Sequence, residues 1–243
     1  MKYRSTTLFV VLCALLVVLF VVDLLVGSVS IPLRDIFAAL LGGEVTPSTR
    51  LIVVDIRLVK AAVAVLAGMA LSVSGLQMQT LFRNPLAGPY VLGISSGASL
   101  GVALFILGMP LLGIATSSTI SSLGTAGAAW LGSALILAFV ASVSTRIKDI
   151  MVILILGMMI SSGVSAVVQI LQYLSNEEAL KSFVIWTMGS LGDVTSKQLG
   201  LLLPAVLIGL SVSVAVIKPL NLLLLGEQYA RTMGLNVRRS RYL

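Results

Sequence analysis

Six apolar stretches alternate with shorter polar segments along this chain of 243 residues. They cover residues 8–26, 58–77, 91–107, 126–143, 150–171 and 199–217, and the third is the shortest. A helix needs about 20 mostly apolar residues to cross the hydrocarbon core of a bilayer. The alternating segments typical of membrane β-barrel strands are absent from the sequence. The pattern therefore predicts an all-α polytopic membrane protein, a helix bundle with about six to seven transmembrane helices.

Composition agrees with a membrane environment. Hydrophobic residues make up 58% of the sequence and charged residues 10%, whereas about a quarter of the residues in a soluble domain are charged. Lys2 and Arg4 before an apolar core also fit a cleaved signal peptide, but no clear small-x-small cleavage site follows, which favours a retained first helix. There is no histidine, and the single Cys13 lies in the first span, so we expect no metal site, cofactor or internal disulfide.

Basic residues are distributed unevenly when the six spans are threaded from an inside N-terminus. The outside segments hold six basic and six acidic residues. The inside segments hold ten basic residues against Asp149 and Glu227, namely Lys2, Arg4, Arg83, Arg146, Lys148, Lys218, Arg231, Arg238, Arg239 and Arg241. This distribution follows the positive-inside rule. It accounts for the net charge of +7 without a nucleic-acid partner, because the excess faces the anionic leaflet of the lipid bilayer.

The segment 81–101 interrupts the apolar pattern between the second and third spans, on the inside. Pro85 and Pro89 prevent a continuous helix there. Gly93 and Gly97 then predict a helix whose neighbours lie very close, because small residues let helix backbones approach in lipid. The pattern predicts a rigid, tightly packed corner, although an ordinary turn satisfies it equally well.

The run from Gly75 to Gly101, GLQMQTLFRNPLAGPYVLGISSGASLG, resembles the signature of the FecCD-like permease subunits of type II ABC importers. That family takes up iron-siderophores, haem and vitamin B12. The segments DIRLVKAAVAVLAGMALSVSG, WTMGSLGDV and PLNLLLLGEQYARTMGLNVRRSR agree with the family in order and spacing. The loop of the signature comprises Arg83, Asn84, Pro85, Leu86, Ala87, Pro89, Gly93 and Gly97.

The resemblance implies a single transmembrane permease domain over residues 1–243, similar to the first part of a ten-helix permease. It implies transport of an iron-siderophore, haem or cobalamin-type chelate across a bacterial or archaeal cytoplasmic membrane. Implied partners are a second copy of the permease, an extracytoplasmic binding protein and cytoplasmic ABC ATPase subunits. The 243 residues contain no GxxxxGK[ST] phosphate loop, so ATP hydrolysis is assigned to the separate ATPase and not to this chain.

Two partner surfaces follow from the resemblance. Arg57 and Lys60, in the sequence RLVK, match an outside basic pair that receives acidic residues of the binding protein, although both would equally anchor a helix end at the headgroups. Residues 218–243 match the cytoplasmic loop that contacts the ATPase. Its short helix is expected to enter an ATPase groove, with a helix lying on lipid as the alternative. The residues concerned are Gly226, Glu227, Tyr229, Ala230, Met233 and Gly234.

Several alternatives remain open from the sequence. The family's inner gate lies between the fourth and fifth spans, where either Ser144 with Thr145 or Asp149 with Ile150 would take its place. Family members are longer, so the chain is expected to be a fragment or C-terminally truncated, and an inactive membrane fragment or scaffold is one alternative function. A secondary transporter or channel is another, since interrupted helices suit it, but no intramembrane carboxylate pair or histidine is available for ion coupling.

Overall fold

The structure is a computed structural model, and it describes residues 2–111, 113, 118–144, 146–147, 150–192 and 194–236. Every regular element in this part of the chain is a helix, so the all-α expectation is confirmed. The chain forms two compact units, which are described one at a time. The first consists of Met1–Met69 with Ser190–Leu207, and the second of Ala70–Gly189 with Ile208–Leu243.

Five helices in the described residues are long and apolar enough to cross a membrane. They are Thr6–Leu25, Ile94–Leu111, Leu123–Ser144, Met151–Leu174 and Ser196–Leu224, which correspond to the first, third, fourth, fifth and sixth expected spans. The second expected span, 58–77, begins at the last residue of the π-helix η1 (Leu51–Leu58) and otherwise lies in α4 (Val59–Phe82), a helix of 24 residues that is not among the five. Five of the six expected spans are therefore confirmed as apolar helices of sufficient length, whereas the second span and the inside–outside threading stay predictions.

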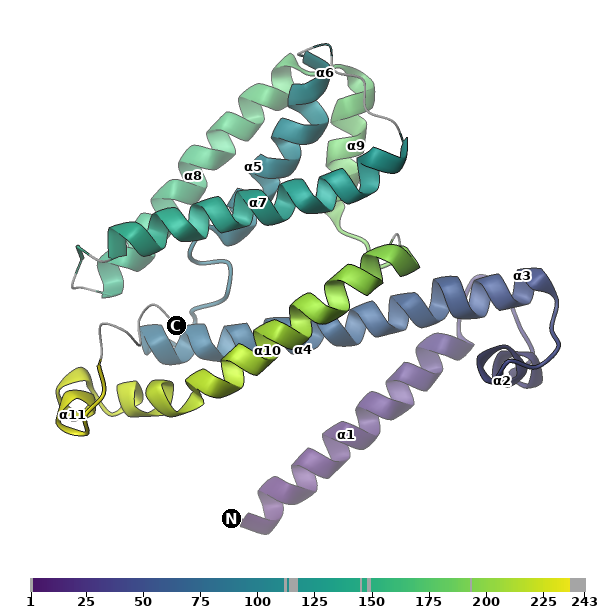
Figure 1. Cartoon of the computed structure of the whole chain (residues 1–243), viewed down its shortest axis with the longest axis horizontal. Coiled ribbons are helices and arrows are strands. Elements are labelled where there is room, and N and C mark those ends of the chain that lie inside the picture. Colours follow the sequence, from purple (N-terminus) through teal and green to yellow (C-terminus); the bar gives the residue numbers. More distant parts are fainter. Residues whose placement is uncertain are drawn as a thin grey trace. The chain divides into compact units, whose positions relative to one another are not determined.

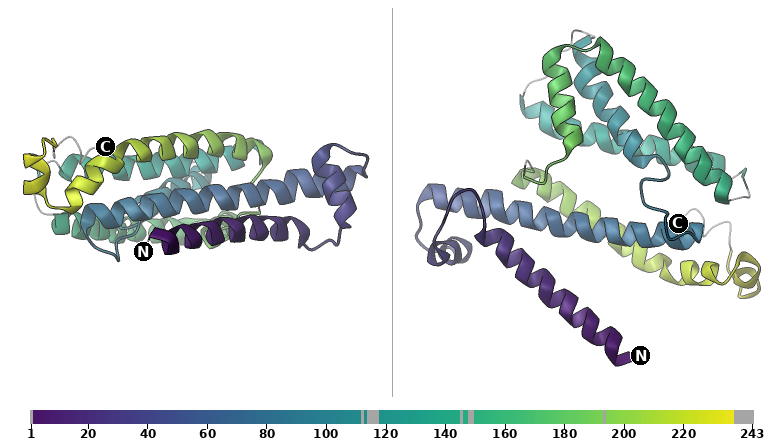
Figure 2. Two further views of the ribbon diagram at one scale, coloured as in Figure 1. Left: turned by 90° about the horizontal axis from the view of Figure 1, so that it is seen from below. Right: turned by 180° about the vertical axis from the view of Figure 1, so that it is seen from behind.

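The first unit joins a long helix to two short ones. After α1 (Lys2–Leu25) come α2 (Leu33–Leu41), α3 (Pro47–Arg50) and the π-helix η1 (Leu51–Leu58), which continues into α4. Figure 2 shows the short helices at the junction between the end of α1 and the start of α4. Ile36 and Ala39 of α2 pack against Val53 of η1. Packing of these side chains holds the connection between the two long helices compact.

The second unit is a bundle around α5 (Ile94–Ala103), which continues through η2 (Leu104–Gly108) and α6 (Met109–Leu111). In Figure 1, α5 lies beside α7 (Ser118–Ser144), α8 (Ile150–Leu174) and α9 (Glu177–Met188). The remaining elements of this unit are the end of α10 (Ser196–Leu224) and α11 (Glu227–Thr232). The bundle core contains Val102, Leu107, Val168 and Phe183. Asn176 begins α9 by accepting a hydrogen bond from the backbone N–H of Ala179.

Glycines bring α5 and α7 into backbone contact. A β-carbon added to Gly97 would lie 2.6 Å from the carbonyl oxygen of Gly132, and one on Gly101 would overlap the carbonyl oxygen of Ala128. No β-carbon fits in such a gap, so only glycine allows this approach. The close neighbours that the sequence predicted for Gly97 are therefore confirmed, with α7 as the neighbour.

We expect Gly97→Ala to lower the stability of the bundle by about 1–3 kcal/mol, because the new methyl group meets backbone that cannot move aside. Gly163→Ala on α8 is the matched control, since a β-carbon at Gly163 meets nothing within 4 Å. In that helix the same substitution should be neutral or stabilising by up to about 1 kcal/mol. Thermal unfolding of the detergent-purified proteins distinguishes the two. Equal unfolding midpoints for both variants would contradict the close α5–α7 contact.

Candidate functional site

The signature loop begins where α4 ends. The backbone N–H of Arg83 donates to Thr80 at 3.3 Å and that of Asn84 to Gln79 at 3.1 Å, which is the hydrogen-bond pattern of a Schellman C-cap. Arg83 has φ 48, in the left-handed region. For a residue other than glycine such a conformation costs about 1–3 kcal/mol. The loop therefore starts from a strained arginine at a position that helices usually give to glycine.

Side chains of α4 and of the loop hold the loop's backbone in place. Nε2 of Gln79 donates to the carbonyl oxygen of Pro85 at 3.0 Å. Oδ1 of Asn84 accepts from the backbone N–H of Leu86 at 2.9 Å, and the carbonyl of Asn84 accepts from Ala87 at 3.1 Å. Ala87 is 3% exposed and belongs to the buried cluster of this unit. These contacts confirm the packed corner that the two prolines predicted, and its rigidity stays a prediction.

The loop reaches alongside the middle of a membrane-spanning helix. Gly93 ends the loop with φ 78, and a β-carbon there would lie 3.1 Å from Oγ of Ser161 and 3.3 Å from the carbonyl oxygen of Gly157. These α8 residues follow its first residue by 7 and 11 positions, or about 10 and 16 Å at 1.5 Å per residue. Irregular backbone is tolerated at such depth only where protein buries it or where it lines a water-filled cavity. The interruption, from Arg83 to Gly93, therefore ends packed against α8 and is covered there by protein, and we call it the re-entrant segment.

A polar groove lies between α5 and α8, and its first lining residue, Ser95, follows Gly93 by two positions. Its volume is about 360 Å³, and its lining is Ser95, Ser96, Ser99, Val164, Ser165, Val168, Gln169 and Gln172. None of these side chains is charged. Within the described part of the chain, the amide groups of Gln169 and Gln172 make no hydrogen bond. The groove therefore offers neutral donors and acceptors along two membrane-spanning helices. We call it the α5–α8 groove.

The polar residues of the α5–α8 groove form a regular pattern in the sequence, although they belong to none of the motifs. Ser95 and Ser99 are four residues apart, and Ser165, Gln169 and Gln172 follow at spacings of four and three. Residues at these spacings share one helix face. Polar stripes on two apolar spans were therefore visible, but their pairing required the tertiary structure. Among the described residues, no group of three or more acidic, cysteine or histidine side chains could hold a metal ion.

Arg57 is buried and hydrogen-bonded to the end of α1. Its guanidinium donates through Nη1 to the carbonyl oxygens of Leu24 at 2.9 Å and Leu25 at 3.1 Å, and through Nη2 to that of Val29. The side chain is 6% exposed. A β-carbon on Gly27 would lie 2.6 Å from Nη2, so glycine leaves room for the guanidinium. Arg57 thus supplies partners to helix-end carbonyls, which lack partners within their own helix.

Lys60 also faces α1 but is more accessible. Its Nζ lies 2.9 Å from Oδ1 of Asp23, and the two side chains are 44% and 35% exposed. An exposed ion pair of this kind contributes little stability, about 0–1 kcal/mol. The two basic residues that were expected to act alike therefore differ. The guanidinium of Arg57 is buried and hydrogen-bonded within the chain, whereas the side chain of Lys60 remains partly accessible. Their role in docking stays a prediction.

The expected coupling helix is present as α11, preceded by Gly226 with φ 116. Tyr229 and Met233 are 49% and 60% exposed, whereas Ala230 is fully buried against Leu223 at the end of α10. Ala230 therefore attaches α11 to its own chain, and the two larger side chains remain available to a partner. Gly234 follows the helix with φ 84 and donates its N–H to the carbonyl of Arg231.

Arg83 joins the signature loop to the same region. Its Nη2 donates to the carbonyl oxygen of Leu223, in the last turn of α10. The sequence placed this arginine among the basic residues on the inside, and the structure shows that its guanidinium is bonded to a helix end within the second unit. The sequence could not predict this hydrogen bond, because Arg83 and Leu223 are 140 positions apart.

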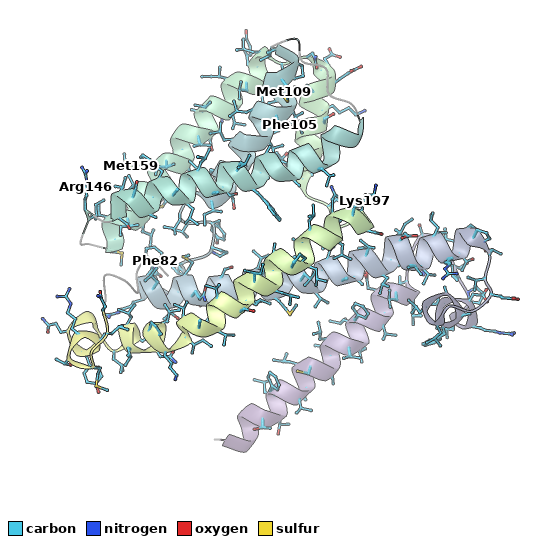
Figure 3. All side chains as sticks on the ribbon, viewed as in Figure 1. Phe82, Phe105, Met109, Arg146, Met159 and Lys197 are labelled. Atoms are coloured by element: carbon cyan, nitrogen blue, oxygen red, sulfur yellow. The ribbon has the colours of Figure 1, made fainter. Side chains whose placement is uncertain are left out.

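Some of the predicted residues lie outside the described part of the chain. They are Thr145 and Asp149 of the inner-gate candidates, together with Lys148, Arg238, Arg239 and Arg241, and the side chains of Ile150 and Glu227. Of the gate candidates, Ser144 is described, and its Oγ donates to the carbonyl of Ala141 at 2.9 Å. The turn after α7 is marked by Arg146 in Figure 3.

A family model for the FecCD transport family matches residues 15–243. The chain belongs to the FecCD transport family. Its apolar helices and its permease relatives make it a multi-pass membrane protein.

Individual relatives carry different cargo. The molybdate import system permease protein MolB of Haemophilus influenzae is 32% identical over 96% of this chain and 68% of the relative's length. The hemin transport system permease protein HmuU of Yersinia pestis is 38% identical over 77% of this chain and 55% of its own length. A solved structure described as an inward-facing metal-chelate type ABC transporter matches with a TM-score of 0.79 at 29% identity, over 96% of this chain and 70% of its own. The chain thus spans between about half and 70% of these proteins.

Proposed function

We propose that the chain is the permease subunit of an ATP-binding-cassette importer, and that its cargo is an iron-siderophore, haem or a related chelate. The observation that carries the proposal is the re-entrant segment leading into the α5–α8 groove, in a chain of the FecCD transport family. A polar, uncharged groove beside irregular backbone is suited to passing a solute through a bilayer. The chain acts as one transmembrane domain over residues 1–243, without catalytic residues of its own.

The α5–α8 groove forms part of the cargo path in this proposal. Polar side chains in membrane helices face the protein interior or a water-filled cavity, because exposure of an unsatisfied polar group to lipid costs several kcal/mol. Serine hydroxyls and glutamine amides offer hydrogen bonds without a fixed charge. A path needs interactions strong enough to admit a solute and weak enough to release it. The neutral lining of the α5–α8 groove meets both requirements.

The proposed partners bind at opposite ends of the membrane-spanning helices. With the N-terminus inside, α11 lies on the cytoplasmic side for the ATPase, and Lys60 lies outside for the binding protein. In this arrangement Arg57 positions the end of α1, and Lys60 supplies the accessible charge of the docking surface. A homodimer in the cytoplasmic membrane completes the proposed importer. A channel or secondary transporter has no use for the exposed Tyr229 and Met233 of α11, which is why we favour the importer.

The test of the proposed function is ATPase binding. Tyr229→Ala combined with Met233→Ala should abolish co-purification of the cognate ATPase subunit. Loss of one buried anchor commonly costs about 2 kcal/mol, which corresponds to roughly 30-fold in affinity. Gln228→Ala, on the same helix and exposed, is the control and should retain the ATPase. An ATPase that stays bound to the double variant would show that α11 does not enter an ATPase groove.

The docking proposal predicts that a substitution of Lys60 lowers the affinity for the binding protein, whereas a substitution of Arg57 lowers the stability of the chain. We expect Lys60→Gln to weaken binding of the cognate binding protein severalfold at low salt and to leave the unfolding midpoint nearly unchanged. Arg57→Ala should instead destabilise the chain by about 1–3 kcal/mol, because three carbonyls lose their donor. Lys197→Gln is the control for an exposed basic residue (Figure 3). If Lys60→Gln bound the binding protein with unchanged affinity across a range of salt concentrations, Lys60 would have no role in docking, and its pairing with Asp23 would be its only interaction of the two.

The cargo-path proposal predicts water in the α5–α8 groove. In a Cys13→Ser background, Gln169→Cys should react with a membrane-impermeant thiosulfonate roughly tenfold or more faster than Ile170→Cys, because thiols react as thiolates, which require water. The two positions are adjacent on α8, and Ile170 is 59% exposed but does not line the groove. Equal labelling rates for the two variants would show that lipid or packed protein fills the α5–α8 groove.

A further inference from the structure

Arg83 occupies a backbone position that glycine would fill more easily. Among the described residues it is the only one other than glycine with a positive φ. It follows the last residue of α4, where the two C-cap hydrogen bonds require the left-handed conformation. Glycine adopts this conformation without a steric penalty. An observed backbone outlier of this kind points to a function for the side chain.

The side chain makes one specific long-range contact. Nη2 of Arg83 donates to the carbonyl oxygen of Leu223 in the last turn of α10. The same carbonyl also accepts from the backbone N–H of Gly226 at 3.1 Å, and a cation is favourable at a helix C-terminus. Both residues belong to the second unit. The guanidinium thus fastens the start of the signature loop to the end of α10.

Leu223 is also the residue to which α11 is attached. Its side chain is 6% exposed and packs on Ala230, which is fully buried, with Leu222 and Leu235 around them. The side chain of Leu223 therefore holds α11 while its carbonyl holds Arg83. A displacement of α11 must act on the residue that Arg83 holds.

The other end of the connection is the re-entrant segment. Hydrogen bonds from Gln79 and to Asn84 stiffen the loop that Arg83 begins. The loop ends at Gly93, against Gly157 and Ser161 of α8. We infer that this hydrogen-bonded loop passes a pull on Arg83 to the contact at Gly93, two residues before Ser95 of the α5–α8 groove.

We propose that Arg83 transmits movement of α11 to the re-entrant segment and so links the state of the ATPase to the α5–α8 groove. The inference rests on the proposed function, in which α11 is the ATPase contact. Arg83 contacts neither the ATPase nor the cargo, so it is a positioning residue. Its strained backbone is retained because only a long cationic side chain at that position reaches Leu223.

The test uses the assembled importer in membranes or nanodiscs, with a non-hydrolysable ATP analogue and Mg²⁺ as the probe. In the complex without substitutions, the analogue should change deuterium uptake at backbone amides 84–93 and the labelling rate of Gln169→Cys. Arg83→Gly removes the side chain and suits the backbone, so the unfolding midpoint should not fall and the ATPase should co-purify. Both nucleotide-dependent changes should nevertheless be lost.

Two further variants frame the result. Arg83→Lys keeps a cationic donor and should retain part of the nucleotide response, whereas Arg146→Gln, an exposed arginine in the turn after α7, should retain all of it. A full response in Arg83→Gly would overturn the inference while leaving the importer intact. A lower unfolding midpoint or loss of the ATPase in Arg83→Gly would also overturn the inference, because Arg83 would then serve only to stabilise the fold. Failure of the unsubstituted complex to bind the ATPase would overturn the proposed function and this inference together.

Discussion

The absence of water inside a bilayer is the constraint on which the second unit depends. Backbone N–H and C=O groups that leave a helix there must find partners within the protein. The segment between Arg83 and Gly93 meets this demand with side-chain amides from Gln79 and Asn84 and with its own turns. Gly157 of α8 lets that helix close against the backbone of Val91 and Leu92, and glycines on α5 and α7 bring those two helices into contact with each other. The packing of the bundle follows from this need to enclose irregular backbone.

The two units meet similar demands by similar means. In the first unit, Arg57 supplies donors to the carbonyls at the end of α1. In the second unit, Arg83 supplies a donor to the end of α10. Arginine suits both positions because its guanidinium carries several donors and always keeps its charge. Each contact joins elements that lie far apart in the sequence, so each arginine defines the geometry of a surface proposed for a partner.

The sequence was informative wherever the signal was local. Apolar length identified five of the spans, the two prolines identified the interruption, and the glycines before and after 227–232 delimited α11. The sequence could not show that Arg57 is buried, because its partners lie 28 to 33 residues away. It also could not show that Ala230 faces inward, since a helix of six residues presents no unambiguous apolar face. The α5–α8 groove needed both of its helices in place before their polar stripes formed one site.

The contact between Gly93 and Gly157 has a consequence for how the chain is made. Gly157 is synthesised 64 residues after Gly93, and α7 and the first part of α8 must leave the ribosome before it arrives. Until then the re-entrant segment has no protein to cover its backbone on that side, and lipid cannot do so. The segment must therefore remain at the water interface or within the insertion machinery while the next two helices are made. Membrane insertion of this part of the chain is in this sense a delayed and cooperative event, in which α5, α7 and α8 reach their final depth together.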